Sequence, residues 1–161
     1  MRLTIIYEVK IREVEPCGCG DEGDLIAELN GKLFKVYYQM PHDFIKEYLL
    51  NKLVWEQEDS FVYKIKDSDN CNILINLWLV YGHCKLTENK NKLFQIDLNK
   101  CGGLCRGEII SITQDSQVRI DCGIFIDVDN EEDLNSEYKI GAYVEVRGTY
   151  QIYFPNTEYD R

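Results

Sequence analysis

Residues 107–154 of the chain read GEIISITQDSQVRIDCGIFIDVDNEEDLNSEYKIGAYVEVRGTYQIYF. Over much of this stretch apolar and polar residues alternate, and turn-forming residues interrupt the alternation at short intervals. A period of two is typical of β-strands with one buried face, and several short strands spaced in this way are typical of a sandwich or a barrel. The pattern therefore predicts short strands that curl into a small barrel. They cover residues 107–113, 117–121, 124–128 and 142–154.

The same part of the chain carries most of the excess negative charge. Residues 104–161 hold 12 acidic and 5 basic residues, against 16 and 13 in residues 1–103, and the formal net charge of the whole chain is −10. Binding to the nucleic-acid backbone requires clustered Lys and Arg, and the five bases here are isolated. The charge therefore disfavours nucleic acid as a partner. It favours either a solvated face that maintains solubility or a surface that attracts a basic partner.

The densest acidic run covers residues 127–137 and contains no basic residue. A loop that is merely solvated is one interpretation of it. The other is a binding surface for a basic protein, because complementary charge accelerates association. The candidate partner-binding residues are Asp127, Asp129, Glu131, Glu132, Asp133 and Glu137.

The N-terminal part of the chain also has a β pattern, with one helix in it. Asn30-Gly31 separates two apolar runs and predicts a hairpin, because both residues tolerate positive φ. Pro41 suits the first turn of a helix and Asp43 complements its positive end, and apolar residues at helical spacing follow. The sequence therefore predicts one helix over residues 41–53. The predicted strands cover residues 3–14, 25–29, 33–38, 60–66, 73–86 and 92–98.

The last predicted strand begins within a short motif, YKIGAYVEVRG. It resembles the I-G-D-x-V-x-V-x-G strand of OB-like small-barrel domains. The matching residues are Ile140, Gly141, Val144, Val146 and Gly148, whereas Ala142 stands where a polar residue is usual. The order of three strands, a helix and further strands is also similar to the OB-fold, a five-stranded barrel. The resemblance implies a mainly β fold (α+β with one clear helix), built as one or more OB-like small barrels of antiparallel strands.

OB-like barrels that bind nucleic acid stack bases on exposed aromatic side chains within a basic groove. Tyr143, Tyr150 and Tyr153 could supply the aromatic side chains, although a tyrosine in a strand more often packs against a neighbouring strand. The basic groove is missing. The resemblance therefore describes the scaffold and leaves its ligand open.

Two domain arrangements fit the pattern. The chain is either one compact unit of residues 1–161, or a pair of OB-like halves with boundaries at 1–100 and 104–155. The segments LWLVYGHCKL and VEVRGTYQI are weakly similar, and each places a glycine mid-strand, at Gly82 and Gly148. A mid-strand glycine often marks a bulge or a bend, as a small barrel needs.

The seven cysteines are most simply reduced thiols, because the N-terminal MRLTIIYEVKIREVE does not resemble a secretory signal. This predicts a cytoplasmic location. Cys17, Cys19, Cys101 and Cys105 lie in glycine-rich loops and are the candidate ligands of a four-cysteine zinc site. One residue between Cys17 and Cys19 is tighter than the usual spacing. The alternative is two independent loops that contain thiols, with no cofactor.

Catalytic signatures are absent from the sequence: there is no glycine-rich phosphate loop and no nucleophile-elbow pattern, and the chain has two histidines. The most apolar stretch, residues 73–81, is too short to span a bilayer. We therefore expect a non-enzymatic protein without a membrane partner, and the sequence indicates no oligomeric state. The favoured function is a binding module for a basic protein, with an immunity or inhibitor protein as its most concrete form. The alternatives are an OB-like single-stranded nucleic-acid binder and a zinc-stabilised structural protein.

Overall fold

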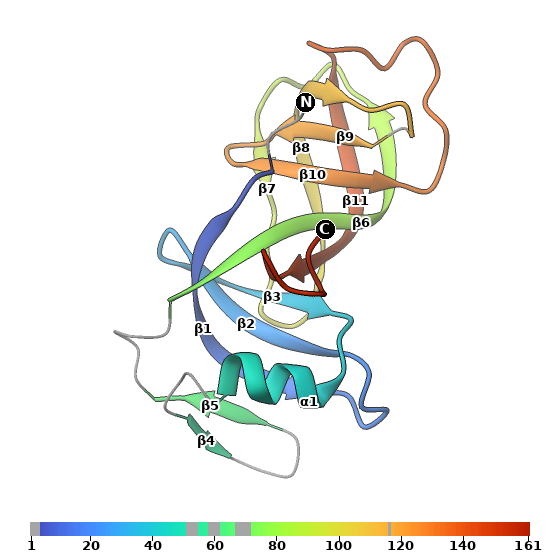
Figure 1. Cartoon of the computed structure of the whole chain (residues 1–161). Coiled ribbons are helices and arrows are strands. Elements are labelled where there is room, and N and C mark those ends of the chain that lie inside the picture. Colours follow the sequence, from blue (N-terminus) through green and yellow to red (C-terminus); the bar gives the residue numbers. More distant parts are fainter. Residues whose placement is uncertain (1–3, 51–54, 58–61, 67–71, 116) are drawn as a thin grey trace.

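Strands dominate the architecture, as the alternation predicts (Figure 1). The computed structural model of the chain describes residues 4–50, 55–57, 62–66, 72–115 and 117–161. Its elements in chain order are β1 (Tyr7–Pro16), β2 (Gly23–Leu29), β3 (Lys32–Tyr38), α1 (His42–Ile45), η1 (Lys46–Leu50), β4 (Trp55–Gln57), β5 (Tyr63–Ile65), β6 (Asn72–Leu86), β7 (Leu93–Phe94), β8 (Gly102–Ile112), β9 (Val118–Asp121), β10 (Phe125–Asn130) and β11 (Tyr143–Tyr153). The prediction of a mainly β fold with one helical segment is confirmed.

The hairpin predicted at Asn30-Gly31 joins β2 to β3. Both residues have positive φ, 53° and 78°, and Leu29 pairs with Lys32 across the turn. A two-residue connection with two positive φ angles matches the right-handed twist of the flanking strands. The turn therefore fixes the register by which β2 and β3 bury their alternate side chains.

The strand pairings close two rings that share β6 and β11. In the first ring β1 pairs with β2 and β6, β2 with β3, β3 with β11, and β11 with β6. In the second, β6 pairs with β10, β10 with β9, β9 with β8, and β8 with β11. Most pairs are antiparallel as expected, but β3–β11 and β6–β10 are parallel. Figure 1 shows β6 and β11 running between the upper part of the molecule and its middle.

A bulge lies where the shared strands pass from one ring to the other. β11 shifts register at Gly148, opposite Tyr81 and Gly82 of β6, and Tyr81 has a φ of 55°. A Cβ on Gly148 would lie 2.6 Å from the carbonyl oxygen of Val80. The backbones approach so closely that only glycine fits. The interpretation of these mid-strand glycines as a bulge or bend is therefore confirmed.

The buried residues of both rings form one apolar cluster. Strand β11 supplies Val144 and Val146 to the second ring and Ile152 near the first, and all three are fully buried. The division of the chain into residues 1–100 and 104–155 stays a prediction. The pairings of β11 with β3 and β6 run across that boundary.

The helical segment differs in form from the prediction. An α-helical turn begins after Pro41 and passes at Lys46 into a π-helical turn that ends at Leu50. The ring of Phe44 lies 4.5 Å from that of Tyr159, between ring centroids, and Tyr48 lies 4.6 Å from Phe154. These contacts bury one face of the helix, as its apolar spacing predicted. The predicted residues 51–53 lie outside the described residues.

Several predicted strands differ in extent, and one strand was not predicted. The strand predicted over residues 3–14 is observed as β1 from Tyr7 to Pro16, with residue 3 outside the described residues. Of the predicted 60–66, β5 covers Tyr63–Ile65, and residues 60 and 61 lie outside the described residues. β7 covers only Leu93–Phe94 of 92–98, and β8 begins at Gly102 rather than at residue 107. Beyond β7 the chain approaches β3, where the amide of Lys35 donates to the carbonyl of Asp97 at 2.8 Å. Strand β4 pairs with β5 at the edge of the sheet.

Candidate functional sites

Asp127, the first residue of the predicted acidic surface, lies inside the sheet. It stands directly opposite Arg119 on β9, and its side chain is 8% exposed. The Arg119 Nε donates to its Oδ1 at 2.8 Å and an Nη to its Oδ2 at 3.1 Å. This two-point ion pair joins β9 to β10. The carboxylate of Asp127 is therefore used within the fold.

Asp129 is also neutralised within the fold. Its Oδ2 accepts a hydrogen bond from Arg161 at 2.5 Å. The same guanidinium lies 4.0 Å from the ring centroid of Trp78 and donates to the hydroxyl of Tyr153 at 3.1 Å. Desolvation lowers the pKa of Arg161, but the hydrogen bond to Asp129 and the contacts with Tyr153 outweigh it, so the pKa is raised overall. Asp129 and Arg161 thus form a local pair beside an aromatic cluster.

The remaining acids gather on the connection from β10 to β11, which we call the acidic loop (residues 131–137). It is the orange segment that bulges from the side of the second ring in Figure 1. Its exposed carboxylates belong to Glu131, Glu132, Asp133 and Glu137.

Among the described residues, one contact joins this loop to a basic side chain. Glu131 Oε2 lies 3.4 Å from His83 Nε2, and its amide donates to the carbonyl of Gly82. Within the described part of the chain, no ion pair joins the other three carboxylates to a Lys or Arg. The loop is held by Asn135, whose side chain accepts from the amide of Glu137 at 2.9 Å, and by the hydroxyl of Tyr138, which donates to the carbonyl of Cys84. The acidic loop therefore presents concentrated negative charge that no Lys or Arg of the described residues pairs with.

The four predicted zinc ligands are not brought together. Cys101 donates its thiol hydrogen to Asp24 Oδ1 at 3.2 Å, and burial, followed by this bond, raises its pKa to about 12. Cys105 is fully buried, 3.3 Å from the hydroxyl of Tyr150. A hydrogen bond with the thiol of Cys122, together with burial, raises the pKa of Cys105. Each of these thiols therefore has a partner within the fold, Asp24 for Cys101 and Tyr150 for Cys105.

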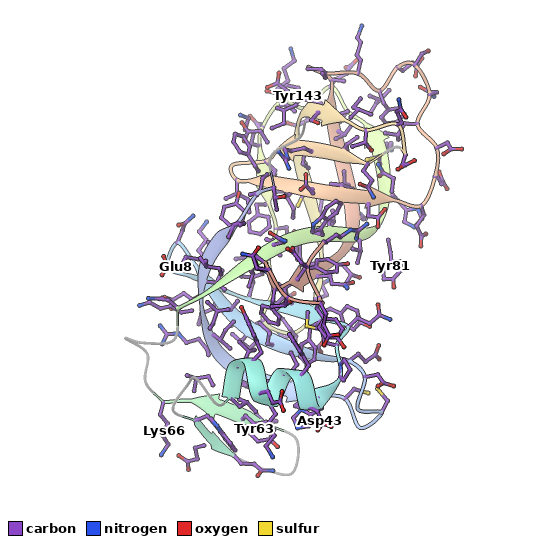
Figure 2. All side chains as sticks on the ribbon, in the orientation of Figure 1. Glu8, Asp43, Tyr63, Lys66, Tyr81 and Tyr143 are labelled. Atoms are coloured by element: carbon purple, nitrogen blue, oxygen red, sulfur yellow. The ribbon has the colours of Figure 1, made fainter. Side chains whose placement is uncertain are left out.

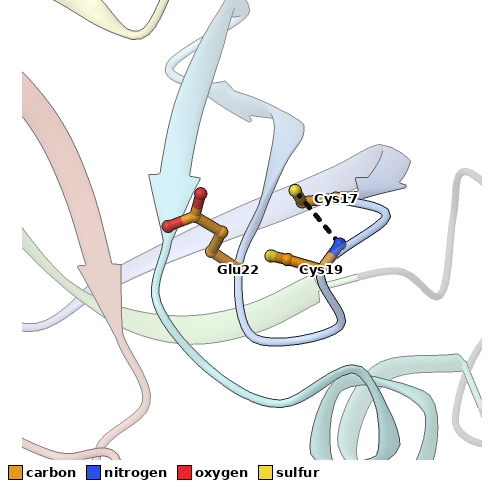
Figure 3. A group of neighbouring side chains, drawn as sticks. All are labelled: Cys17, Cys19 and Glu22. Atoms are coloured by element: carbon orange, nitrogen blue, oxygen red, sulfur yellow. Dashed lines mark hydrogen bonds between the residues drawn. The ribbon is translucent and has the colours of Figure 1, made fainter.

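Cys17 and Cys19 have a different neighbour, Glu22. Among the described residues these three form the one group of His, Cys, Asp or Glu side chains whose ligand atoms all lie within 4.8 Å of one another. Figure 3 shows them on the loop from β1 to β2, with the Cys19 amide donating to Cys17 Sγ at 3.4 Å. That bond lowers the pKa of Cys17, but the thiol of Cys19, slight desolvation and the charge of Glu22 raise it overall. When both thiols ionise, their two negative charges therefore lie close to that of the Glu22 carboxylate.

A cavity of about 400 Å³ was not indicated by the sequence. It lies between the β2–β3 hairpin, β7 and the turn after β9. Apolar side chains such as Phe34, Phe94 and Ile124 line it, and Lys92 at its edge bonds Asp121 Oδ2 at 2.7 Å. That bond lowers the pKa of Asp121. The lining residues come from three distant segments, so no local pattern could reveal them.

No protein-family model matches the chain, and neither does any curated protein or solved structure. Its function has to be inferred from its own residues. Within the described ranges no helix has both the length and the apolar character required to cross a membrane. The six cysteines of those ranges are free, and Cys71 lies outside them.

Proposed function

We propose that the chain is a non-enzymatic binding module whose acidic loop engages a basic protein. One observation carries the proposal: two acids of the run are neutralised within the fold by arginines, whereas those of the acidic loop are exposed and lack Lys or Arg partners among the described residues. Clustered like charges repel one another and disfavour the compact state. A basic partner would convert this repulsion into attraction and accelerate encounter. An inhibitor or immunity protein that neutralises a cationic nuclease is the concrete form that we favour.

We infer that the scaffold of this module is a pair of OB-like barrels. The first ring supports this, because β1, β2 and β3 are followed by the helical segment and then by β6, which returns to pair with β1. The OB-fold is a five-stranded Greek-key barrel, and each ring has five strands. We also propose that the protein works in the reducing cytoplasm, which the free thiols support.

Neutralising the acidic loop is expected to slow capture of the partner. The test variant carries Glu131→Gln, Glu132→Gln and Asp133→Asn. The matched control carries Glu8→Gln, Glu47→Gln and Glu88→Gln, three exposed acids elsewhere. Both variants change the net charge equally. Pull-downs from native cytoplasm with the parent and both variants identify basic proteins whose recovery depends on the loop. The rate at which each purified partner associates with the parent and with both variants is then measured by stopped-flow mixing.

The parent and the control should associate at similar rates, whereas the loop variant should associate about tenfold more slowly at low salt. Its rate should also depend less on salt concentration, because fewer charges steer the encounter. An equal association rate for the loop variant at low salt would contradict the proposal. So would an equal slowing of the control, because total charge and not the loop would then be responsible.

An aromatic cluster supports single-stranded nucleic acid as a second candidate ligand. Trp78 and Tyr153 flank the guanidinium of Arg161, and the neighbouring Tyr81 is 53% exposed and points away from the ribbon in Figure 2. Bases stack on such side chains with little sequence preference. If this candidate is right, a labelled oligonucleotide should bind at low salt, and Tyr81→Ala should weaken it roughly 5- to 150-fold. The acidic-loop proposal predicts no such binding. Fluorescence anisotropy of the labelled oligonucleotide distinguishes the two candidates.

A further inference from the structure

We propose that the loop between β1 and β2 binds a divalent transition-metal ion of the zinc class, through Cys17 Sγ, Cys19 Sγ and a carboxylate oxygen of Glu22. Thiolate and carboxylate are established zinc ligands, with bonds of about 2.3 and 2.0–2.2 Å. A tetrahedron with such bonds separates its ligand atoms by roughly 3.5–3.8 Å. The three ligand atoms already lie within 4.8 Å of one another. Small side-chain rotations therefore suffice to close them on an ion.

The backbone holds this loop in a ligating shape. The amide of Cys17 donates to the carbonyl of Glu22 at 2.8 Å, which joins the first ligand residue to the last. Within the loop, Gly20 donates to the carbonyl of Cys17 at 3.1 Å and has a φ of 84°. The carbonyl of Gly20 in turn accepts from the amide of His42 at the start of α1 at 2.7 Å. The loop is thus a closed turn fixed to the helix, so little ordering is left for the metal to impose.

The carboxylate of Glu22 is already oriented by a neighbour. The hydroxyl of Tyr37 on β3 donates to its Oε2 at 2.5 Å. Carboxylates that bind metals are themselves usually hydrogen-bonded, and removal of such a partner typically weakens metal binding 10- to 100-fold. The bond leaves Oε1 for the ion. Tyr37 is therefore the positioning residue of the site.

A buried hydroxyl beneath the loop independently points to a ligand. The side chain of Tyr38 is fully buried, and its hydroxyl has no hydrogen-bond partner among the described residues. It lies against Gly23, the residue that follows the ligand residue Glu22 in the chain. A buried hydroxyl without a partner costs free energy. A water in the fourth position of the metal would give this hydroxyl a partner, so we assign three protein ligands and one solvent ligand.

This site is independent of the acidic loop. In Figure 1 the β1–β2 loop lies beside α1, at the opposite end of the molecule from residues 131–137. Absence of metal binding would therefore not contradict the proposal for the acidic loop. Failure of the acidic-loop proposal would likewise not contradict the metal site.

Titration with Co²⁺ under reducing, oxygen-free conditions tests the proposal. We expect one ion per chain, with a near-ultraviolet thiolate-to-cobalt charge-transfer band, visible bands of a four-coordinate ion, and displacement by Zn²⁺. Cys17→Ser and Cys19→Ser should abolish the charge-transfer band or halve it. Glu22→Gln and Tyr37→Phe should each weaken binding at least tenfold. Cys101→Ser is the matched control, since its thiol bonds Asp24 instead, and it should bind as the parent does.

Circular dichroism and the thermal midpoint in chelator show that each variant is folded before it is titrated. Absence of a charge-transfer band in the folded parent would overturn the proposal. A band that requires Cys101 and Cys105 but not Glu22 would overturn this ligand set and restore the four-cysteine site. Because an ion that binds the folded state stabilises it, Zn²⁺ should raise the thermal midpoint of the parent. It should not raise that of the Cys17→Ser variant.

Discussion

Replacement of Gly107 by alanine is expected to destabilise the protein by about 3 kcal/mol, or to prevent folding. Gly107 is a buried residue of β8 that faces the end of β9. A Cβ there would clash with the carbonyl oxygen of Asp121, and would lie 2.6 Å from its carbonyl carbon and 2.9 Å from the Cα of Cys122. All three atoms belong to the backbone, so no side-chain rotation relieves the overlap. The strands have to separate, which breaks the second ring at its β8–β9 side.

Urea unfolding followed by tryptophan fluorescence measures this effect. Gly18→Ala is the matched control, because a Cβ at Gly18 meets nothing within 4 Å and its φ is not in the left-handed region. We expect the control to change the free energy of unfolding by less than about 0.5 kcal/mol. A Gly107→Ala variant that unfolds at the parent's urea concentration would show that β8 and β9 are farther apart than described.

The Asp127→Asn variant is expected to lose about 3–5 kcal/mol of stability, because it removes the charge of the carboxylate that accepts two hydrogen bonds from the Arg119 guanidinium inside the sheet. The side chains of Arg119 and Asp127 are 12% and 8% exposed, so water replaces the lost carboxylate poorly. Asparagine keeps the shape of the side chain. The loss therefore measures charge and hydrogen bonding rather than a cavity.

A double-mutant cycle isolates this pair. The variant Arg119→Met with Asp127→Leu should recover most of the stability that either single change removes, because apolar replacement of a whole buried pair is often neutral. Urea midpoints of all four proteins give the coupling free energy. Additive losses would contradict a direct interaction between the two side chains. For an exposed pair such as Glu56 and Lys66 the same cycle should show little coupling, because water screens the two charges.

Local sequence patterns predicted the individual strands well and their partners poorly. The alternation in residues 142–154 and the Asn30-Gly31 turn are properties of neighbouring residues, so β11 and the β2–β3 hairpin lie close to their predicted limits. The sharing of β6 and β11 depends on contacts between distant segments, which no local period encodes. The π-helical end of the helix likewise reflects packing against Tyr159 and Phe154.

The candidate sites show the same division between local and distant effects. Asp127 and Glu132 are equivalent acids in the sequence, yet one opposes Arg119 inside the sheet and the other is exposed. Only the pairing of β9 with β10 distinguishes them. The spacing of Cys17 and Cys19 placed them near each other, but Glu22 completes the group because the loop closes on itself.

The shared strands also dictate the order of events during synthesis on the ribosome. β11 pairs with β3 and β6 in the first ring and with β8 in the second, so neither ring can close before residues 143–153 have emerged. Until then β3, β6 and β8 have unpaired edges, which are prone to pair with other chains. Contacts so distant in sequence also slow the search for the native pairing. The nascent chain should therefore stay sensitive to proteases and dependent on chaperones until residues 143–153 have emerged and paired, and then become resistant in a single step.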